Sequence, residues 1–333
     1  MKKIIVILLF TNNIVNACDI CGCFMGILPY DNQSNIAFFH RYRIFNGYYA
    51  QHQRGIFFPS GAYRVMHGNH SNNQAVDTTK KYLSSDFESY KTYELRIKWF
   101  IHSRIELNAI LPFVDSRMRE DTIKVKHFGL SDPTFLFGYH VIKKIHEEKF
   151  QHRLILLSGI KLPSGNYYAK DQYGNRIPLI LQPGTGSVDY LLGYTYILGY
   201  KKYGLMLNTM YKINGENYYH ERIANSLTMN LMTLCKIKWK DWLFIPSWQS
   251  YYEYTKGLYI QNNYILGTKM NVLLSGVGLD INYKQIALSF AGQWRLYEEK
   301  TSMDAMKSKG RMIIGLTYNF NQRNYLIKEK NQR

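Results

Sequence analysis

Hydrophobic residues recur at every second position over many stretches of the chain, which is the pattern of β-strands that have one apolar face. In the clearest stretch, Tyr190 and Leu192 begin one alternating run, and Leu205 and Leu207 begin the next. A tight turn that starts at Lys201 joins the two runs. This stretch predicts a β-hairpin whose second face carries small, hydroxyl-bearing or charged residues.

The same alternation predicts strands along most of the chain. The further runs lie at 36–45, 86–101, 104–113, 130–141, 153–162, 222–239, 242–254, 270–283, 286–297 and 311–320. Together with the hairpin they make about twelve strands, and the connections between them alternate between long and short, with the longest at 46–85. A soluble sandwich with Greek-key crossings gives no reason for this alternation. Bacterial outer-membrane barrels have long external loops, short periplasmic turns and an even strand number. We therefore predict an all-β fold, a transmembrane antiparallel up-and-down β-barrel.

The N-terminus has the features of a secretory signal peptide. Lys2 and Lys3 precede a short apolar run, and small residues up to Ala17 form an acceptable cleavage site. No other run approaches the 18 apolar residues of a membrane helix. We expect a signal peptide at 1–17, a cysteine-containing segment at 18–34, the barrel at 35–320 and a basic tail at 321–333. The predicted location is the outer membrane of a Gram-negative bacterium, with both termini in the periplasm.

The formal net charge of +18 changes this picture little. Such a charge often indicates nucleic-acid binding, but here the basic residues are scattered along the chain. We therefore expect no nucleic acid among the partners. The expected partners are the lipid bilayer, the barrel-assembly machinery and a small-molecule solute.

The polar faces of the strands would line the lumen, and they carry charges of both signs. Two interpretations stand: the charges brace and close the barrel, or they form a charged constriction that orients small solutes. The network favoured by the strand pairing joins Glu94 and Arg96 with Arg104 and Glu106 across a tight turn. The pore candidates are Arg41, Arg43, Glu94, Arg96, Lys98, Arg104, Glu106, Asp132, Asp189 and Arg295.

The segment that would follow the signal peptide contains Cys18, Cys21 and Cys23. Three interpretations compete. Cys18 follows a sequence that loosely resembles a lipoprotein box, which would make it an acylation site. The three thiols could bind a soft metal or act in redox chemistry. They could also form a disulfide with a spare thiol, or a short plug in the barrel. We expect no other cofactor.

Three segments resemble the outer-membrane barrels of the meta-pathway phenol-degradation family, often called simply transporters. They are 129–134 (GLSDPT), 159–165 (GIKLPSG) and 182–189 (QPGTGSVD), which are similar to a G-x-G-D strand start, a G-x-K-x-P-T-G exit and a G-T-G-S-W-D re-entry. Ser131, Pro133, Ser164 and Val188 depart from these patterns. The start CDICGC resembles a Bacteroidetes-type subgroup of the family. The resemblance implies an outer-membrane channel for small aromatic or other hydrophobic molecules.

Three functions follow in order of preference. The first is a channel or transporter for small solutes. The second is a structural or surface barrel with a filled lumen, and the third is a metal-handling barrel that uses the cysteines. No arrangement of catalytic residues is recognisable from the spacing, so we expect no enzyme.

Overall fold

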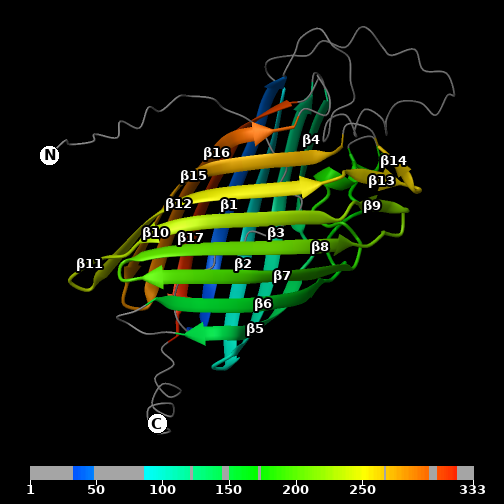
Figure 1. Ribbon diagram of the computed structural model, residues 1–333. Helices are drawn as coiled ribbons and strands as arrows, with labels where there is room; N and C mark the ends of the chain where they lie inside the picture. Colours follow the sequence, from blue (N-terminus) through cyan, green and yellow to red (C-terminus); the bar gives the residue numbers. More distant parts are fainter. Residues whose placement is uncertain are drawn as a thin grey trace.

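The computed structural model describes residues 33–48, 86–120, 123–144, 150–171, 174–265, 268–299 and 306–320, and they form a closed antiparallel β-barrel (Figure 1). The strands of its wall are β1 (Asn35–Tyr48), β2 (Phe87–His102), β3 (Ile105–Glu120), β5 (Thr134–Lys144), β6 (Gln151–Lys161), β7 (Asp189–Tyr200), β8 (Tyr203–Asn214), β10 (Ser226–Cys235), β12 (Trp242–Thr255), β15 (Met270–Tyr283), β16 (Ile286–Glu298) and β17 (Met306–Asn319). The predicted fold class and the strand number of twelve are confirmed.

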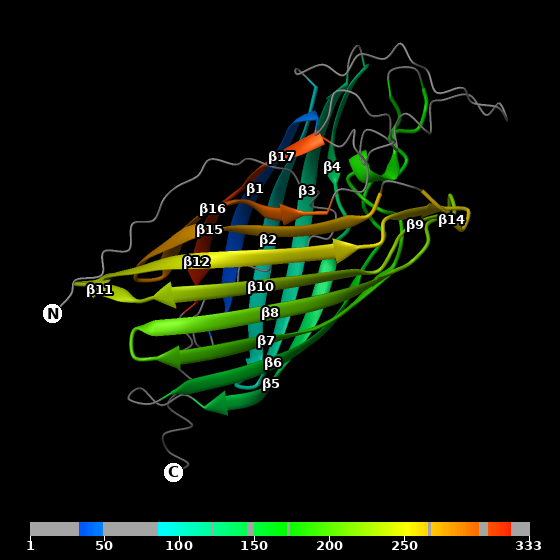
Figure 2. The ribbon, with the colours of Figure 1, turned by 45° about the horizontal axis from the view of Figure 1, so that its top comes forward.

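Strands that follow one another in sequence pair along the wall, and β1 pairs with β17 to close it. Asn35 lies opposite Asn319, beside the short turn between β15 and β16, where the Asn319 amide donates to the Gln285 carbonyl. The first and last wall strands therefore begin and end at the short-turn end. The longer connections leave from the opposite end, where β9 (Glu221–Ile223), β13 (Leu258–Ile260) and β14 (Asn263–Tyr264) form a small separate sheet (Figure 2).

The two faces of the wall differ in the way the alternation predicts. On β7, Leu192 is 53% exposed on the outside, while Asp189 is fully buried on the lumen side. On β17, Met312, Ile314 and Leu316 all point outward and are exposed. A wall with an apolar outer face and charges inside is the arrangement that a bilayer requires, because lipid solvates only the outer side chains. Within the described residues, no helix has the length and apolar character needed to cross a bilayer.

Several predicted boundaries were wrong. Within the stretch 114–128, expected to be a loop, residues 114–120 continue β3 and residues 123–128 belong to β4 (Ile123–Leu130). β4 pairs with Phe113–Glu120, the part of β3 that lies beyond its pairing with β5. The expected strand 222–239 is divided into β9, β10 and β11 (Ile237–Trp239). The β3 part of this extension, Val114–Glu120, has only two apolar residues, and the alternation in β4 covers only Ile123-Lys124-Val125-Lys126, which is too short a run to stand out in the sequence. The predicted signal peptide, cysteine segment and basic tail lie outside the described residues.

Candidate functional site

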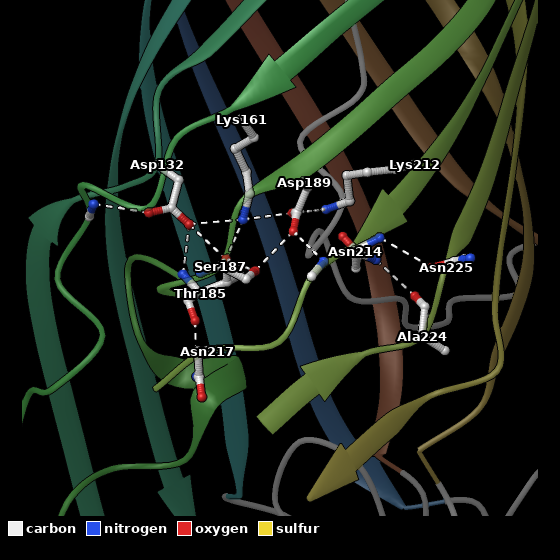
Figure 3. A network of polar contacts seen from close by, with 12 residues as sticks. Asp132, Lys161, Thr185, Ser187, Asp189, Lys212, Asn214, Asn217, Ala224 and Asn225 are labelled. Carbon is white, nitrogen blue, oxygen red and sulfur yellow. Dashed lines mark hydrogen bonds and ion pairs between the residues drawn. The ribbon is translucent and has the colours of Figure 1, made fainter. Parts of the chain in front are cut away.

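The polar residues of the three motif segments meet inside the barrel at its long-loop end. Asp132 precedes β5, Lys161 ends β6, and Asp189 begins β7, so adjacent strands bring the three side chains to one level of the wall. Thr185 and Ser187 belong to the connection that returns from β6 to β7. Figure 3 shows these five side chains pointing toward one another. Residues that are up to 57 positions apart in sequence (132 to 189) thus form one network.

Asp132 is the acceptor at the centre of this network. One of its carboxylate oxygens accepts from the backbone N–H of Gly165 at 2.9 Å. The other accepts from the N–H of Thr185 at 2.7 Å, from its hydroxyl at 2.8 Å and from the Lys161 ammonium at 2.9 Å. The carboxylate therefore ties both ends of the β6–β7 connection to the wall.

Lys161 lies between two carboxylates, since its ammonium is 2.9 Å from Asp132 and 2.7 Å from Asp189. The Asp189 carboxylate also accepts from the Ser187 hydroxyl at 2.9 Å and lies 3.6 Å from the Lys212 ammonium. Two lysines and two aspartates alternate along the wall. Because opposite charges lie side by side, the buried charges are compensated locally, which burial requires.

Two glycines of the motif segments allow the β6–β7 connection to approach Asp132 closely. A Cβ on Gly184 would lie 2.7 Å from the Gly165 carbonyl carbon and 2.8 Å from the Asp132 carboxylate. A Cβ on Gly165 would also be 2.7 Å from that carboxylate. Any larger residue at either position would push the backbone away, so here the motif glycines serve close packing.

The β6–β7 connection places apolar residues across the barrel end, and we call residues 179–182 the cap. The cap contains a short 3-10 helix, Leu179–Leu181, whose three residues are buried. Gln182 fixes it by donating from its side-chain amide to the carbonyls of Ala169 and Ile177. Leu179 also packs with Ile223 and Leu258 of the small sheet. Hydrogen bonds and apolar packing thus hold the cap in a defined position.

A partly enclosed cavity of about 110 Å³ lies in the lumen under the cap. Part of its lining is charged and belongs to the barrel wall. Another part is apolar and comes from both the cap and the wall. The charged members are Arg41, Glu94, Asp132, Lys161 and Lys212, and the apolar members include Leu179, Ile180, Ile110, Leu136, Leu191 and Met210.

The apolar side of the cavity continues into a larger cluster on the lumen face. Ile110, Leu136 and Leu191 are joined there by Ile155, Leu157 and Met210, all of them buried. These residues come from β3, β5, β6, β7 and β8, so the cluster forms a continuous apolar strip across one wall. Sequence reasoning missed this strip, because it assigned only polar residues to the lumen.

Several of the predicted lumen charges pair in the barrel interior. Glu94 accepts from Arg96 Nε at 2.7 Å and also binds Arg41. Arg43 Nη1 lies 3.7 Å from Glu253 Oε2, and both side chains are almost fully buried. Toward the long-loop end, Arg295 pairs with Glu298 at 2.6 Å.

A second cluster lies nearer the short-turn end. The Glu106 carboxylate lies 2.9 Å from the Lys98 ammonium and 3.1 Å from His140 Nε2. The predicted link from Glu94 and Arg96 through Arg104 to Glu106 was wrong. Arg104 lies just before β3, in the turn, where its side chain is exposed. Lys98 and His140 take the place that was expected for it.

Among the described residues, no group of three or more His, Cys, Asp or Glu side chains is arranged to hold a metal ion. The candidate ligands Cys18, Cys21 and Cys23 lie outside those residues, so the metal and acylation hypotheses stay predictions.

Comparison with known proteins agrees with the fold. Residues 72–287 match the family described as "Putative MetA-pathway of phenol degradation". The structure resembles the COG4313 outer membrane channel from Pseudomonas putida F1, with a TM-score of 0.60 and 14% identity over 88% of this chain and 97% of that chain. The β domain of the Bordetella autotransporter BrkA gives a TM-score of 0.46 and 9% identity, over 87% of this chain and 100% of that chain. None of the curated proteins compared with this chain matches its sequence.

Proposed function

Because the chain belongs to the family of the MetA-pathway of phenol degradation, we propose that it is an outer-membrane channel for small solutes that combine an apolar part with a polar group. The similar barrel from Pseudomonas putida F1 is named a channel, and we extend that function to this chain. The observation that carries the proposal is the cavity under the cap, whose lining combines residues of the apolar strip with paired charges.

The cavity limits the size of the solute. Its volume is about 110 Å³, and an engineered apolar cavity of about 150 Å³ in another protein holds one benzene molecule. A single aromatic ring is therefore about the largest solute that this cavity can hold. Larger solutes would require the cap to move.

The charges favour a neutral solute over an ion. The lining carries three cations and two carboxylates, and each cation has a carboxylate partner: Arg41 binds Glu94, Lys161 lies between Asp132 and Asp189, and Lys212 is 3.6 Å from Asp189 outside the lining. A solute hydroxyl or carbonyl can form a hydrogen bond to such a pair without breaking it. A free carboxylate would have to compete with a carboxylate of the protein and would lose its own hydration.

In the proposed orientation the short turns face the periplasm and the cap lies at the outer mouth. Solutes would enter between the cap and the charged wall and leave along the apolar strip. Insertion by the barrel-assembly machinery and a periplasmic location of both termini belong to the same proposal.

The test is solute flux through the refolded full-length barrel in proteoliposomes, together with single-channel recording. We expect flux of small neutral aromatic alcohols, and an increase in flux when Leu179→Ala and Ile180→Ala together thin the cap. Leu316→Ala on the lipid-facing side is the matched control and should leave the flux unchanged. A folded barrel that passes no small solute, with the cap intact or thinned, would refute the channel.

The ion-pair clusters favour a second candidate, a structural barrel with a filled lumen. Glu94 with two arginines, and Glu106 with Lys98 and His140, brace the interior across strands. In that case the barrel would be silent in bilayers, and replacing these residues would change stability alone. A metal-handling role would depend on the N-terminal cysteines.

A further inference from the structure

Three hairpin turns at the short-turn end share one local sequence pattern: an aromatic residue, a lysine, a polar residue and then another large apolar residue. They are Tyr200-Lys201-Lys202-Tyr203, Trp239-Lys240-Asp241-Trp242 and Tyr283-Lys284-Gln285-Ile286. In each turn the first and last residues are paired partners across the strands. We call these three turns the lysine rim.

Backbone geometry does not explain the lysines. Lys201, Lys240 and Lys284 have positive φ angles of 50°, 53° and 52°. Tight two-residue hairpin turns that need a positive φ favour Gly, Asn or Asp, which adopt it at little steric cost. The chain places lysine at this position in three separate turns, so the side chain itself is what these positions have in common.

Each of these lysines lies over the aromatic ring that precedes it. The ammonium nitrogens are 5.3 Å from the Tyr200 ring centre, 5.6 Å from that of Trp239 and 5.1 Å from that of Tyr283. The rings of Trp242 and Tyr283 also contact each other, with centres 4.6 Å apart, which joins neighbouring hairpins. Two of the three turns are therefore in direct contact, and the Tyr200–Tyr203 turn adjoins the β10–β12 hairpin through the Lys236 N–H, which donates to the Lys202 carbonyl at 2.7 Å.

The rim continues the lipid-facing surface of the wall. Tyr203 is 58% exposed and Trp239 61% exposed, and both lie at the ends of wall hairpins. Exposed Tyr and Trp side chains prefer the depth of lipid headgroups, where one end of the ring meets apolar chains and the other meets water. At that depth the neighbouring ammonium groups face the phosphates.

We propose that the lysine rim binds the phosphate groups of anionic phospholipids in the leaflet that surrounds the short turns. The three turns hold four lysines and one aspartate, an excess of positive charge. A phospholipid presents an acyl chain and a phosphate together, which matches a surface of exposed rings beside ammonium groups. Such contacts would fix the depth of the barrel and would select phosphatidylglycerol over zwitterionic lipids. This inference does not depend on which solute the barrel passes.

The test measures binding of phosphatidylglycerol and of phosphatidylcholine with identical acyl chains to the refolded full-length barrel, by native mass spectrometry at low and high salt. The main variant is Lys201→Asn, Lys240→Asn and Lys284→Asn combined. Asparagine suits a positive φ, so the loss of three charges leaves the turns able to form. The matched control removes three exposed lysines away from the rim, through Lys124→Asn, Lys126→Asn and Lys170→Asn.

We expect the unmodified barrel to prefer phosphatidylglycerol at low salt. In the rim variant, the ratio of phosphatidylglycerol binding to phosphatidylcholine binding should be at least about tenfold lower. Arginine at the same three rim positions should retain the preference, and the control should behave like the unmodified barrel. Equal binding of both lipids by the unmodified barrel would overturn the proposal. So would an equal loss in the rim and control variants, because the effect would then belong to net charge alone.

Discussion

The carboxylate of Asp132 accepts two hydrogen bonds from Thr185, one from its backbone N–H at 2.7 Å and one from its hydroxyl at 2.8 Å. This contact joins the residue before β5 to the end of the connection that carries the cap. Hydrogen bonds to ionised groups contribute about 1.5–3 kcal/mol each, so one carboxylate can hold the connection in place.

Asp132→Asn should therefore loosen the cap without unfolding the barrel. The amide keeps the shape but loses the charge that balances Lys161. We expect the free energy of local opening to fall by about 2 kcal/mol. Hydrogen exchange of residues 163–187 would then be roughly thirtyfold faster. Asp115→Asn, which removes the charge of a carboxylate paired with the partly exposed Arg117 on the β3–β4 extension, is the control and should not affect that segment.

The cluster around Glu106 should be more important for the stability of the whole barrel. Glu106→Gln leaves Lys98 and His140 in the interior without their shared carboxylate. Removing one partner of a buried ion pair typically costs about 3–5 kcal/mol. Urea unfolding in lipid should show a loss of this size, whereas Glu216→Gln at the exposed pair with His220 should change stability by less than about 0.5 kcal/mol. Equal losses of stability in the two variants would show that the Glu106 cluster stabilises the barrel no more than an exposed ion pair does.

The contact between His127 on β4 and Asn166 in the β6–β7 connection should depend on pH. Burial lowers the pKa of the His127 imidazole below its ordinary value of 6.5, and its Nε2 lies 3.3 Å from Asn166 Nδ2. The folded protein therefore resists protonation more than the unfolded chain does. The stabilising contribution is complete above about pH 6.5 and is lost as the pH falls below that value.

Hydrogen exchange of residues 123–130 and 163–168 tests this pH dependence. Protection should decrease between neutral pH and about pH 5. His127→Gln, whose amide stays neutral, should remove that decrease. An unchanged pH profile in the variant would mean that another group is responsible.

The strands of the barrel wall could be predicted from the sequence, because a wall between lipid and lumen must alternate apolar and polar side chains along each strand. In the predicted strand 311–320 the alternation puts Met312, Ile314 and Leu316 on one face, and all three are exposed on the outside. The motif segments were also recognised as related, although the alternation alone assigned Asp132 and Asp189 only to the lumen face. Their convergence with Lys161 and Thr185 depends on strand register across the sheet, which local sequence does not encode.

The apolar strip escaped prediction for a related reason. Ile110, Leu136 and Leu191 occupy positions that the alternation assigns to the lumen, where polar residues were expected. They line the cavity that the cap also lines, and the cap belongs to a connection with no regular period. Apolar residues on the polar face of a membrane strand are the signal that could have revealed the cavity.

The channel account is tested most directly by filling the cavity from the wall. Leu191→Trp places a large ring into the cavity, while Leu192→Trp, one residue later, places the same ring on the lipid side. Flux of small neutral aromatic alcohols into proteoliposomes is measured for both variants, after a gel-shift assay confirms that each barrel is folded. The account predicts that Leu191→Trp lowers the flux at least about tenfold, equivalent to about 1.4 kcal/mol, and that Leu192→Trp leaves it unchanged. Equal flux through two folded variants would contradict it.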